Sequence, residues 1–287
     1  MNALYHLYIN PLEKCNLRCR ICYTRKSSPI LTEEQILNFI YRYQKEHEVQ
    51  TVTLCGGEVF ALPYMTHCIN ILNQEGIFIQ VVTNGTIDRL DELERPNFVN
   101  LIVSVDGLKD YHDKNRGEGN FNKSIDFLKK ARRLGFHTEI FSIVTRQNLK
   151  QIDEFEKYIN GMLGKTDITY HPRKPLNYLK QHPVSNIQGD VEGFDFLTKE
   201  ELIVLMKTKK TFPPKTLGCY QISLMSDGKV YGCCEGFESI GTINDTIKHL
   251  IESFKRKLQK SCSNCIQPDF MCGMKEILNY QVDHDRD

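Results

Sequence analysis

Three cysteines, Cys15, Cys19 and Cys22, lie within eight residues near the start of the chain. They follow a short apolar stretch, Leu4 to Ile9, that predicts a buried strand. Closely spaced thiolates on a loop hold 4Fe-4S clusters, whereas a structural zinc site usually has four ligands, often as two separated pairs. Three cysteines would leave the fourth iron open for chemistry. Buried free thiols, or a zinc loop completed by a distant histidine, are the alternatives.

The C-x-x-x-C-x-x-C spacing after a first strand resembles the radical S-adenosylmethionine (radical SAM) superfamily. In that superfamily, the open iron of the cluster binds the amino and carboxylate groups of S-adenosylmethionine. The chain departs from the common pattern at Ile21, where many members carry an aromatic residue, and Tyr23 follows the third cysteine instead. The resemblance implies that the three cysteines are cluster ligands and that Tyr23 belongs to the cofactor site.

Two glycine-containing turns follow the second and third predicted strands. Gly56, Gly57 and Glu58 form the first turn, and Asn84 begins the second. Glycine lets a backbone approach a ligand closely, but Gly-Gly and Asn-Gly are also ordinary turn sequences. The Gly-Gly-Glu run resembles the superfamily element whose backbone and nearby carboxylate hold the amino group of S-adenosylmethionine. The resemblance therefore places Gly56, Gly57 and Glu58 at the cofactor. Asn84 is a further candidate for the cofactor site, for which a plain turn is the alternative.

Ser104 and Asp106 follow the fourth predicted strand, and Arg116 comes twelve residues after the serine. With His112 and Asp113 between them, they resemble a longer pattern in the sub-branch that modifies peptides and proteins. In that branch the serine and the arginine contact the carboxylate and ribose of S-adenosylmethionine. An arginine suits a carboxylate because its planar fork donates two hydrogen bonds at once. A solvated turn is the alternative interpretation.

Strands and helices alternate over most of the chain. The predicted strands are 4–9, 51–54, 77–83, 99–105, 136–144 and 165–170, and the predicted helices are 32–43, 61–74, 87–93, 120–134 and 149–162. Such alternation indicates an α/β fold of parallel βα units, and six units fit a partial (β/α)6, TIM-like barrel. Barrel enzymes place their active sites at the carboxyl ends of the strands, where all the residues above lie. Periodicity alone does not separate a barrel from a doubly wound sheet, so this choice comes from the resemblance.

A smaller unit is expected to follow the barrel. The sequence predicts an irregular loop over 176–197, a helix over 198–210, a hairpin around Ser226-Asp227-Gly228 and a last helix over 247–258. We therefore divide the chain into a radical SAM barrel, residues 1–205, and a C-terminal cysteine-rich extension, residues 206–287.

The extension contains Cys219, Cys233, Cys234, Cys262, Cys265 and Cys272. With Gly228 between the first two, this pattern resembles the SPASM and Twitch extensions of radical SAM enzymes, which carry auxiliary clusters. A full SPASM domain needs more cysteines, so the resemblance implies one auxiliary 4Fe-4S cluster held by Cys219, Cys233, Cys262 and Cys265. Cys234 and Cys272 are left over, and either could replace one of these ligands or be a thiol that works in the active site. A structural zinc site is the alternative, because paired cysteines suit zinc equally well.

Cys234 and Glu235 directly follow the predicted ligand Cys233. Similar dehydrogenases that oxidise a protein side chain carry an aspartate directly after the equivalent cysteine, where it takes up a proton. Here a thiol stands in that place, which counts against a formylglycine-type oxidation. Glu235 is the candidate base and Cys234 a candidate hydrogen-atom donor, and a buried thiol without a role is the alternative.

Composition excludes some classes of protein. Lys plus Arg number 37 against 36 Asp plus Glu, so the charge does not indicate a nucleic-acid partner. No signal peptide or long apolar run occurs, which predicts a cytoplasmic protein without a membrane partner. Eleven cysteines in a reducing compartment favour metal ligands over disulfides. Cys55 and Cys68 are interpreted as small hydrophobic residues, and His171 and Arg173 as residues at the barrel rim that are candidates for substrate contact.

The resemblance implies a redox enzyme. An electron donor such as flavodoxin or ferredoxin would reduce the first cluster, S-adenosylmethionine would yield a 5′-deoxyadenosyl radical, and this radical would remove a hydrogen atom from the substrate. The run from Ser104 to Arg116 favours a ribosomally made peptide or a protein side chain as the substrate. A single auxiliary cluster instead resembles dehydrogenases of small molecules such as sugars or cyclitols. A zinc-stabilised binding module is the alternative outside enzymology.

Overall fold

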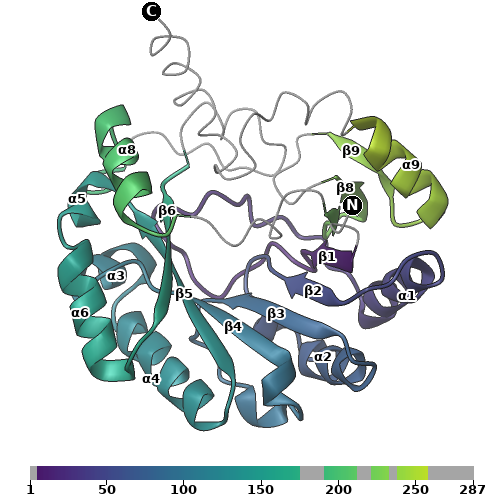
Figure 1. Cartoon of the computed structure of the whole chain (residues 1–287), viewed down its shortest axis with the longest axis horizontal. Coiled ribbons are helices and arrows are strands. Elements are labelled where there is room, and N and C mark those ends of the chain that lie inside the picture. Colours follow the sequence, from purple (N-terminus) through teal and green to yellow (C-terminus); the bar gives the residue numbers. More distant parts are fainter. Residues whose placement is uncertain (1–4, 175–190, 212–220, 233–237, 258–287) are drawn as a thin grey trace, which may run out of the picture.

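The structure is a computed structural model that describes residues 5–174, 191–211, 221–232 and 238–257 (Figure 1). Its strands are β1 (His6–Ile9), β2 (Thr51–Leu54), β3 (Phe78–Thr83), β4 (Val99–Ser104), β5 (His137–Val144), β6 (Asp167–Pro172), β7 (Ile222–Leu224), β8 (Lys229–Tyr231) and β9 (Ser239–Thr242). They form one sheet in the order β6-β5-β4-β3-β2-β1-β7-β8-β9.

The helices alternate with the strands. They are α1 (Glu33–Gln44), α2 (Met65–Gln74), α3 (Lys109–Arg116), α4 (Asn120–Arg133), α5 (Arg146–Leu149), α6 (Ile152–Leu163), α8 (Lys199–Thr208) and α9 (Ile247–Lys257), with short 3-10 turns η2 (Val59–Ala61), η3 (Leu90–Glu92) and η4 (Pro96–Phe98). In the described ranges, none of the helices combines the length and apolar character that a membrane crossing requires.

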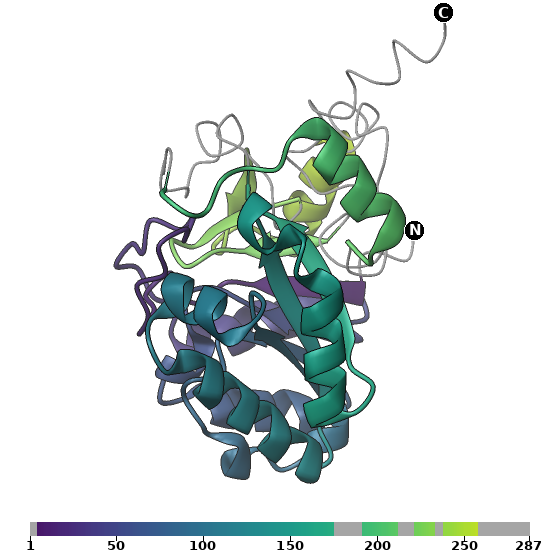
Figure 2. The same cartoon turned by 90° about the vertical axis from the view of Figure 1, so that its left-hand side faces the viewer.

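The first six strands are parallel to their neighbours. The sheet curves, and α1, α2, α4 and α6 lie along its outer side (Figures 1 and 2). The predicted α/β fold with a mostly parallel sheet is therefore confirmed, and its curvature is consistent with a partial barrel.

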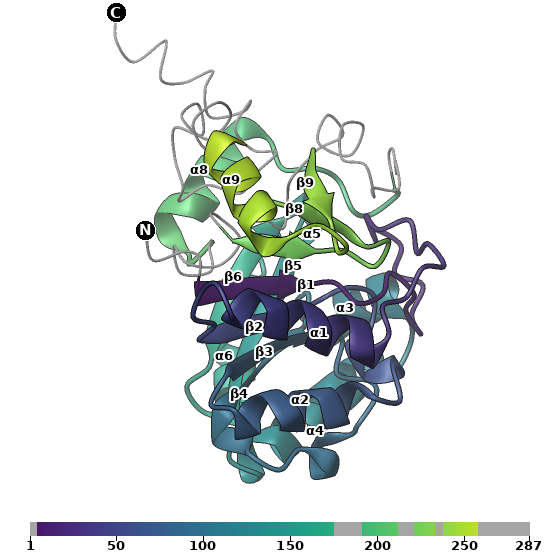
Figure 3. The same ribbon diagram turned by 90° about the vertical axis from the view of Figure 1, so that its right-hand side faces the viewer.

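The predicted hairpin continues this sheet. β7 lies parallel to β1, with Tyr8 opposite Ser223, and β8 returns antiparallel after the turn at Ser226-Asp227-Gly228. Strand β9, which the sequence did not predict, pairs with β8, and α9 lies beside it (Figure 3). The sheet thus crosses the boundary predicted at residues 205 and 206, and the division into two domains stays a prediction.

Helix ends follow local rules where the sequence carries clear signals. Thr32 and Gln35 form the predicted capping box of α1, and Gly135, with φ +87°, follows the end of α4. The helix predicted over 61–74 begins only at Met65, because Leu62 precedes Pro63 and is extended.

Two further local predictions differ from the structure. The helix predicted over 87–93 is a single turn, η3, whose Leu90 amide donates to the side chain of Asp88 rather than continuing a helix. Helix α3 was not predicted, because Tyr111 is the one apolar residue on its buried face, which otherwise consists of His112 and Asn115.

Side chains along each barrel strand point alternately to the hydrophobic core and to the cavity inside the barrel. Leu7 and Ile9 of β1 are fully buried in the core, and so is Ile140 of β5. Tyr8 and Phe141 stand next to these residues in the same strands, and they line a cavity inside the barrel. Successive residues of a strand point to opposite faces, so the pleat that builds the core also lines the cavity.

The Gly56-Gly57 turn brings β2 against the chain that leads to the cysteines. The amide of Gly57 donates to the Leu12 carbonyl at 2.8 Å, and the amide of Glu58 donates to the Lys14 carbonyl at 3.1 Å. A methyl group on Gly57 would lie 1.9 Å from the Lys14 carbonyl oxygen. The two glycines are therefore required by the close approach of two backbones directly before Cys15.

We predict that Gly57→Ala displaces the segment before Cys15 and lowers the free energy of unfolding by about 1–3 kcal/mol, the usual cost of inserting an atom into a packed site. Gly161→Ala is the control, because a methyl group there meets open space in α6 and should raise stability by about 0.5–1 kcal/mol. Denaturant titration of both variants makes the comparison. Equal effects would contradict the close approach.

Candidate active site

A cavity of about 310 Å³ opens at the carboxyl ends of the barrel strands. This volume lies at the lower end of the roughly 300–1,000 Å³ range of ligand pockets. Every strand from β1 to β6 contributes to its wall, through Tyr8, Thr53, Val82, Thr83, Ile102, Ser104, Phe141, Ile143, His171 and Pro172. The site therefore lies where a barrel fold predicts it.

Cys15, Cys19 and Cys22 all line this cavity, and none of them forms a disulfide. The amide of Cys22 donates to the carbonyl of Cys19 at 3.3 Å, which folds the loop so that both side chains lie on the cavity side. The amide of Leu17 donates to the Cys15 sulfur at 3.4 Å. Backbone donors to sulfur stabilise a thiolate and adjust the potential of a cluster bound to it.

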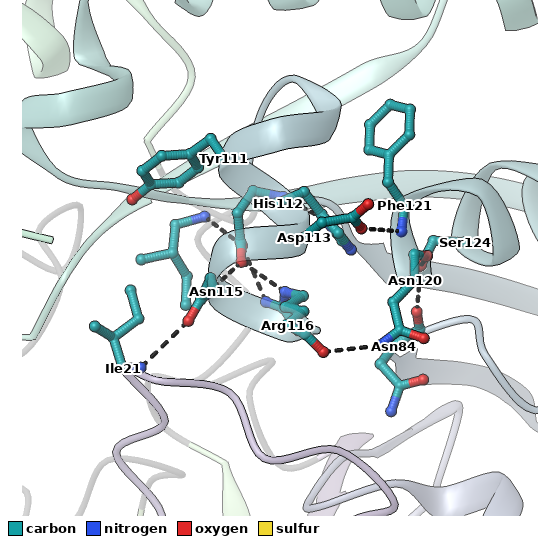
Figure 4. A network of polar contacts seen from close by, with 12 residues as sticks. Ile21, Asn84, Tyr111, His112, Asp113, Asn115, Arg116, Asn120, Phe121 and Ser124 are labelled. Carbon is teal, nitrogen blue, oxygen red and sulfur yellow. Dashed lines mark hydrogen bonds and ion pairs between the residues drawn. The ribbon is translucent and has the colours of Figure 1, made fainter. Parts of the chain in front are cut away.

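The cysteine loop is attached to the end of α3. The carbonyl of Asn115 accepts from the amide of Arg20 at 2.9 Å, and its side-chain oxygen accepts from the amide of Ile21 at 3.2 Å (Figure 4). The Ile21 side chain is buried with Tyr111 and Phe194 in a small apolar cluster. One asparagine thus fixes two consecutive loop amides between the second and third cysteines.

Asp106 and Arg116 form a buried ion pair beside this loop. The Arg116 Nε and one terminal nitrogen donate to the two carboxylate oxygens of Asp106 at 2.6 and 3.0 Å. Asn115 Nδ2 donates to the same carboxylate at 2.7 Å, and the Ile143 amide donates to it at 3.1 Å. Burial raises the pKa of Asp106, but the charge and hydrogen bonds of Arg116 outweigh it and hold that pKa below its usual range.

The guanidinium of Arg116 is the positive charge next to the thiols. Burial lowers its pKa, but Asp106 and the nearby Cys19 and Cys22 raise it above the ordinary value, so the charge is permanent. Burial raises the pKa of the Cys19 thiol, and Arg116 opposes that rise. Burial likewise raises the pKa of Cys15, where the Leu17 amide opposes the rise and Lys26 adds a second positive charge.

Helix α3 contacts Asp106 and the start of α4, and α4 in turn holds the Asn84 turn. His112 of α3 accepts from the Asp106 amide at 3.2 Å through Nδ1, and burial lowers its pKa to about 4, so the ring is neutral. Asp113 accepts from the Phe121 amide at 2.8 Å, and the Ser124 hydroxyl donates to the Asn84 carbonyl at 2.7 Å (Figure 4).

Asn84 reaches the cysteine loop directly. Its Nδ2 lies 2.9 Å from the Asn16 side-chain oxygen and 3.7 Å from the Cys15 sulfur. The carboxylate of Glu58, fully buried behind it, accepts from the Asn84 amide and the Thr83 hydroxyl, each at 2.8 Å. Glu58 therefore positions the turn that brings Asn84 to the first cysteine.

The structure brings together most of the predicted cofactor-site residues that it describes. Those lining the cavity beside the three cysteines are Tyr23, Gly56, Gly57, Asn84, Ser104 and Arg116. Glu58 and Asp106 do not line it, since both carboxylates are fully buried and hydrogen-bonded to the protein. Their direct contact with a cofactor stays a prediction, and their observed contacts position Asn84 and Arg116.

The donor set fits an iron-sulfur cluster, which is held by closely spaced thiolates. Three free thiols share one cavity, and buried thiols that lose their protons to a metal find Arg116 and Lys26 beside them to balance the charge. Ligation of a 4Fe-4S cluster by these cysteines stays a prediction.

The remaining predicted site residues lie outside the described residues. They are Cys219, Cys233, Cys234, Glu235, Cys262, Cys265 and Cys272. Their roles as auxiliary ligands, base or hydrogen-atom donor stay predictions.

Several cavity residues were not predicted from the sequence. Cys55, interpreted as a small hydrophobic residue, lines the cavity, whereas Cys68 is buried in the core as expected. Lys26, Asn115 and Gln221 also line the cavity and belong to no recognisable pattern. The one available signal for Asn115 was its position next to Arg116.

Comparison with known proteins supports these assignments at the level of the fold and the superfamily. Residues 9–159, just over half of the chain, match the sequence profile of the Radical SAM superfamily. The sporulation killing factor maturation protein SkfB of Bacillus subtilis is 26% identical over 146 residues, which cover 49% of this chain and 36% of SkfB. GTP 3′,8-cyclase of Aquifex aeolicus is 25% identical over 274 residues, covering 79% of this chain and 81% of the cyclase.

Solved structures show the same fold. The structure of anSMEcpe with bound AdoMet and Cp18Cys peptide superposes with a TM-score of 0.68 at 20% identity, over 93% of this chain and 87% of that one. Streptococcus suis SuiB bound to its precursor peptide SuiA gives a TM-score of 0.68 at 14% identity, over 92% of this chain and 67% of SuiB. At these identities the likeness concerns the fold alone.

We predict that Asp106→Asn lowers the free energy of unfolding by about 3–5 kcal/mol, because it leaves the buried Arg116 charge without its partner. Asp126→Asn makes the same change in an exposed pair with Lys129 and should have a far smaller effect. Denaturant titration measures both.

The pH dependence of the free energy of unfolding is a second test of the Asp106–Arg116 ion pair. The folded-state pKa of Asp106 is depressed, so its contribution is present above the unfolded pKa of about 3.9 and is lost as the pH falls below that value. The difference between wild type and Asp106→Asn should therefore be constant near neutral pH and shrink below about pH 4. A small difference at neutral pH would contradict the buried ion pair.

Proposed function

The chain belongs to the radical SAM superfamily, whose members are enzymes, and from this premise we propose that it cleaves S-adenosylmethionine reductively and removes a hydrogen atom from a ribosomally made peptide or protein. One observation carries the proposal. The three cysteines share a single cavity with inward-facing side chains of all six parallel strands. A radical formed at the thiol end would thus face a substrate held inside the barrel.

The cysteine end of the cavity provides what a 4Fe-4S cluster and its S-adenosylmethionine require. When bound, the cluster supplies the electron that cleaves S-adenosylmethionine. Cys15, Cys19 and Cys22 would hold three irons. Arg116 donates its Nε and one terminal nitrogen to Asp106. The other terminal nitrogen remains available to donate to a carboxylate on the cavity side.

The rest of the cavity wall is suited to protecting a reactive intermediate. Val82, Ile102, Phe141 and Ile143 present apolar surface, and this limits the water and exchangeable protons that reach the interior. The polar side chains of the wall would orient the substrate.

The names of the relatives support a peptide substrate. SkfB is named as a maturation protein, and MftC of Mycolicibacterium smegmatis, 27% identical over 49% of this chain and 38% of its own length, is named as a mycofactocin maturase. The chain spans little more than a third of each, so their activities are only a guide. A small-molecule substrate is the second candidate, because GTP 3′,8-cyclase matches over 81% of its length.

The C-terminal residues complete the proposal. Cys219, Cys233, Cys262 and Cys265, with Cys272 as a further candidate, would hold one auxiliary 4Fe-4S cluster within a SPASM- or Twitch-type domain, residues 206–287. Glu235 or Cys234 would take up the proton or donate the hydrogen atom that completes the reaction. Flavodoxin or ferredoxin would supply electrons to the first cluster.

The direct test is iron and labile-sulfide analysis of anaerobically purified protein, with measurement of 5′-deoxyadenosine after reduction. Wild type should hold about eight irons, and the triple variant Cys15→Ala, Cys19→Ala, Cys22→Ala should lose about four and form no deoxyadenosine. Cys68→Ala is the control, because Cys68 is buried in the core away from the cavity and should keep both properties.

Two results would count against parts of the proposal. Deoxyadenosine formed by the triple variant would contradict the assignment of Cys15, Cys19 and Cys22 as cluster ligands. A wild-type content near four irons would contradict the auxiliary cluster but not the first cluster.

A further inference from the structure

Among the residues that the structure describes, two polar side chains of the cavity wall carry buried atoms without a hydrogen-bond partner. Gln221 directly precedes β7, and His171 lies in β6. Both line the cavity that contains the three cysteines. Neither Gln221 amide atom, nor His171 Nε2, has a hydrogen-bond partner within the described part of the chain.

Gln221 has more buried unpaired atoms than His171. Its exposed fraction is 0%, and both its Oε1 and its Nε2 are buried and unpaired. An unsatisfied buried polar atom costs about 1–3 kcal/mol, so an apolar residue would serve the fold better at this position. A residue kept at such a cost, at a cavity wall, is explained by a ligand that supplies the missing hydrogen bonds.

His171 adds a second neutral polar group to the same wall. Its ring packs against Phe141 in a tilted arrangement, with centroids 4.5 Å apart and planes at 52°, which restricts its orientation. Burial, with a smaller effect of Lys174, lowers its pKa to about 3, so the ring is uncharged at neutral pH. An uncharged imidazole offers one donor and one acceptor and is a poor partner for an anion.

At least one other polar side chain of the cavity wall is already satisfied. Thr53, which also lines the cavity, contacts His6 Nε2 at 2.7 Å and donates to Gln80 at 2.8 Å. Ser142 and Thr169 have unpaired hydroxyls but do not line the cavity. Unpaired groups that face the interior therefore include a carboxamide and an imidazole, both neutral and both able to donate and accept.

We infer that Gln221 and His171 form an amide-binding subsite that holds a backbone peptide group of the substrate. The carboxamide of Gln221 is complementary to a peptide group, since it donates to the carbonyl and accepts from the N–H. His171 would contact the same or the adjacent peptide group. This inference rests on the proposed function and narrows it, because the chain would recognise a peptide by its backbone inside the barrel.

The test measures binding of a neutral probe, N-acetyl-alanyl-alanine N-methylamide, to the anaerobic holoenzyme in the presence of S-adenosylmethionine. Ligand-observed NMR monitors the binding. Gln221→Met keeps the length of the side chain and removes both hydrogen bonds, so it should weaken binding about tenfold, the effect of one to two net hydrogen bonds. His171→Phe should weaken it in the same direction.

Matched controls use the same substitutions on the surface. Gln50→Met and His137→Phe change exposed residues outside the cavity and should bind the probe as wild type does. Gln221→Met should also unfold at the wild-type temperature or above it, because it replaces unpaired polar atoms with apolar ones. A lower unfolding temperature would show that Gln221 has a structural partner and would overturn the inference.

The remaining outcomes separate this inference from the proposed function. No probe binding to wild type, or equal binding to wild type and Gln221→Met, overturns the subsite. Binding of GTP that depends on Gln221, without binding of the peptide, overturns it in favour of a nucleotide base. Failure of wild type to form deoxyadenosine sinks the proposed function but leaves the binding measurement to decide on the subsite.

Discussion

Asp106 holds the guanidinium of Arg116 by two hydrogen bonds beside Cys19 and Cys22, and the arrangement of the thiol end depends on this pair. Asn115 donates to the same carboxylate while its own oxygens accept from two amides of the cysteine loop. The charge that balances the thiolates and the contacts that fix their loop therefore come from adjacent residues of α3. A shift of this helix would disturb both at once.

A second constraint acts from the opposite side of the loop. The backbone of Gly57 lies so close to Lys14 that no side chain fits between them, and Glu58 holds the turn that brings Asn84 to the Cys15 sulfur. The loop is thus held between α3 and the ends of β2 and β3. Such rigid support is what a reactive site needs, because small displacements of reacting groups cost large factors in rate.

The sequence predicted the parts of the fold that local rules decide. The alternation of strands and helices, the Thr32 capping box and the β7–β8 hairpin follow from periodicity and turn chemistry, and the structure confirms them. Long-range contacts were not predictable. Nothing local distinguishes Asp106, which binds Arg116 rather than lining the cavity, or Gln221, whose position depends on the pairing of β7 with β1.

The central claim is that Cys15, Cys19 and Cys22 hold a cluster whose open iron meets S-adenosylmethionine. Electron paramagnetic resonance of the dithionite-reduced protein tests it, using a variant with alanine at Cys219, Cys233, Cys262 and Cys265 to remove the auxiliary site. We expect a cluster signal that persists in this variant and changes when S-adenosylmethionine is added. A signal that is absent, or that S-adenosylmethionine leaves unchanged, would contradict it.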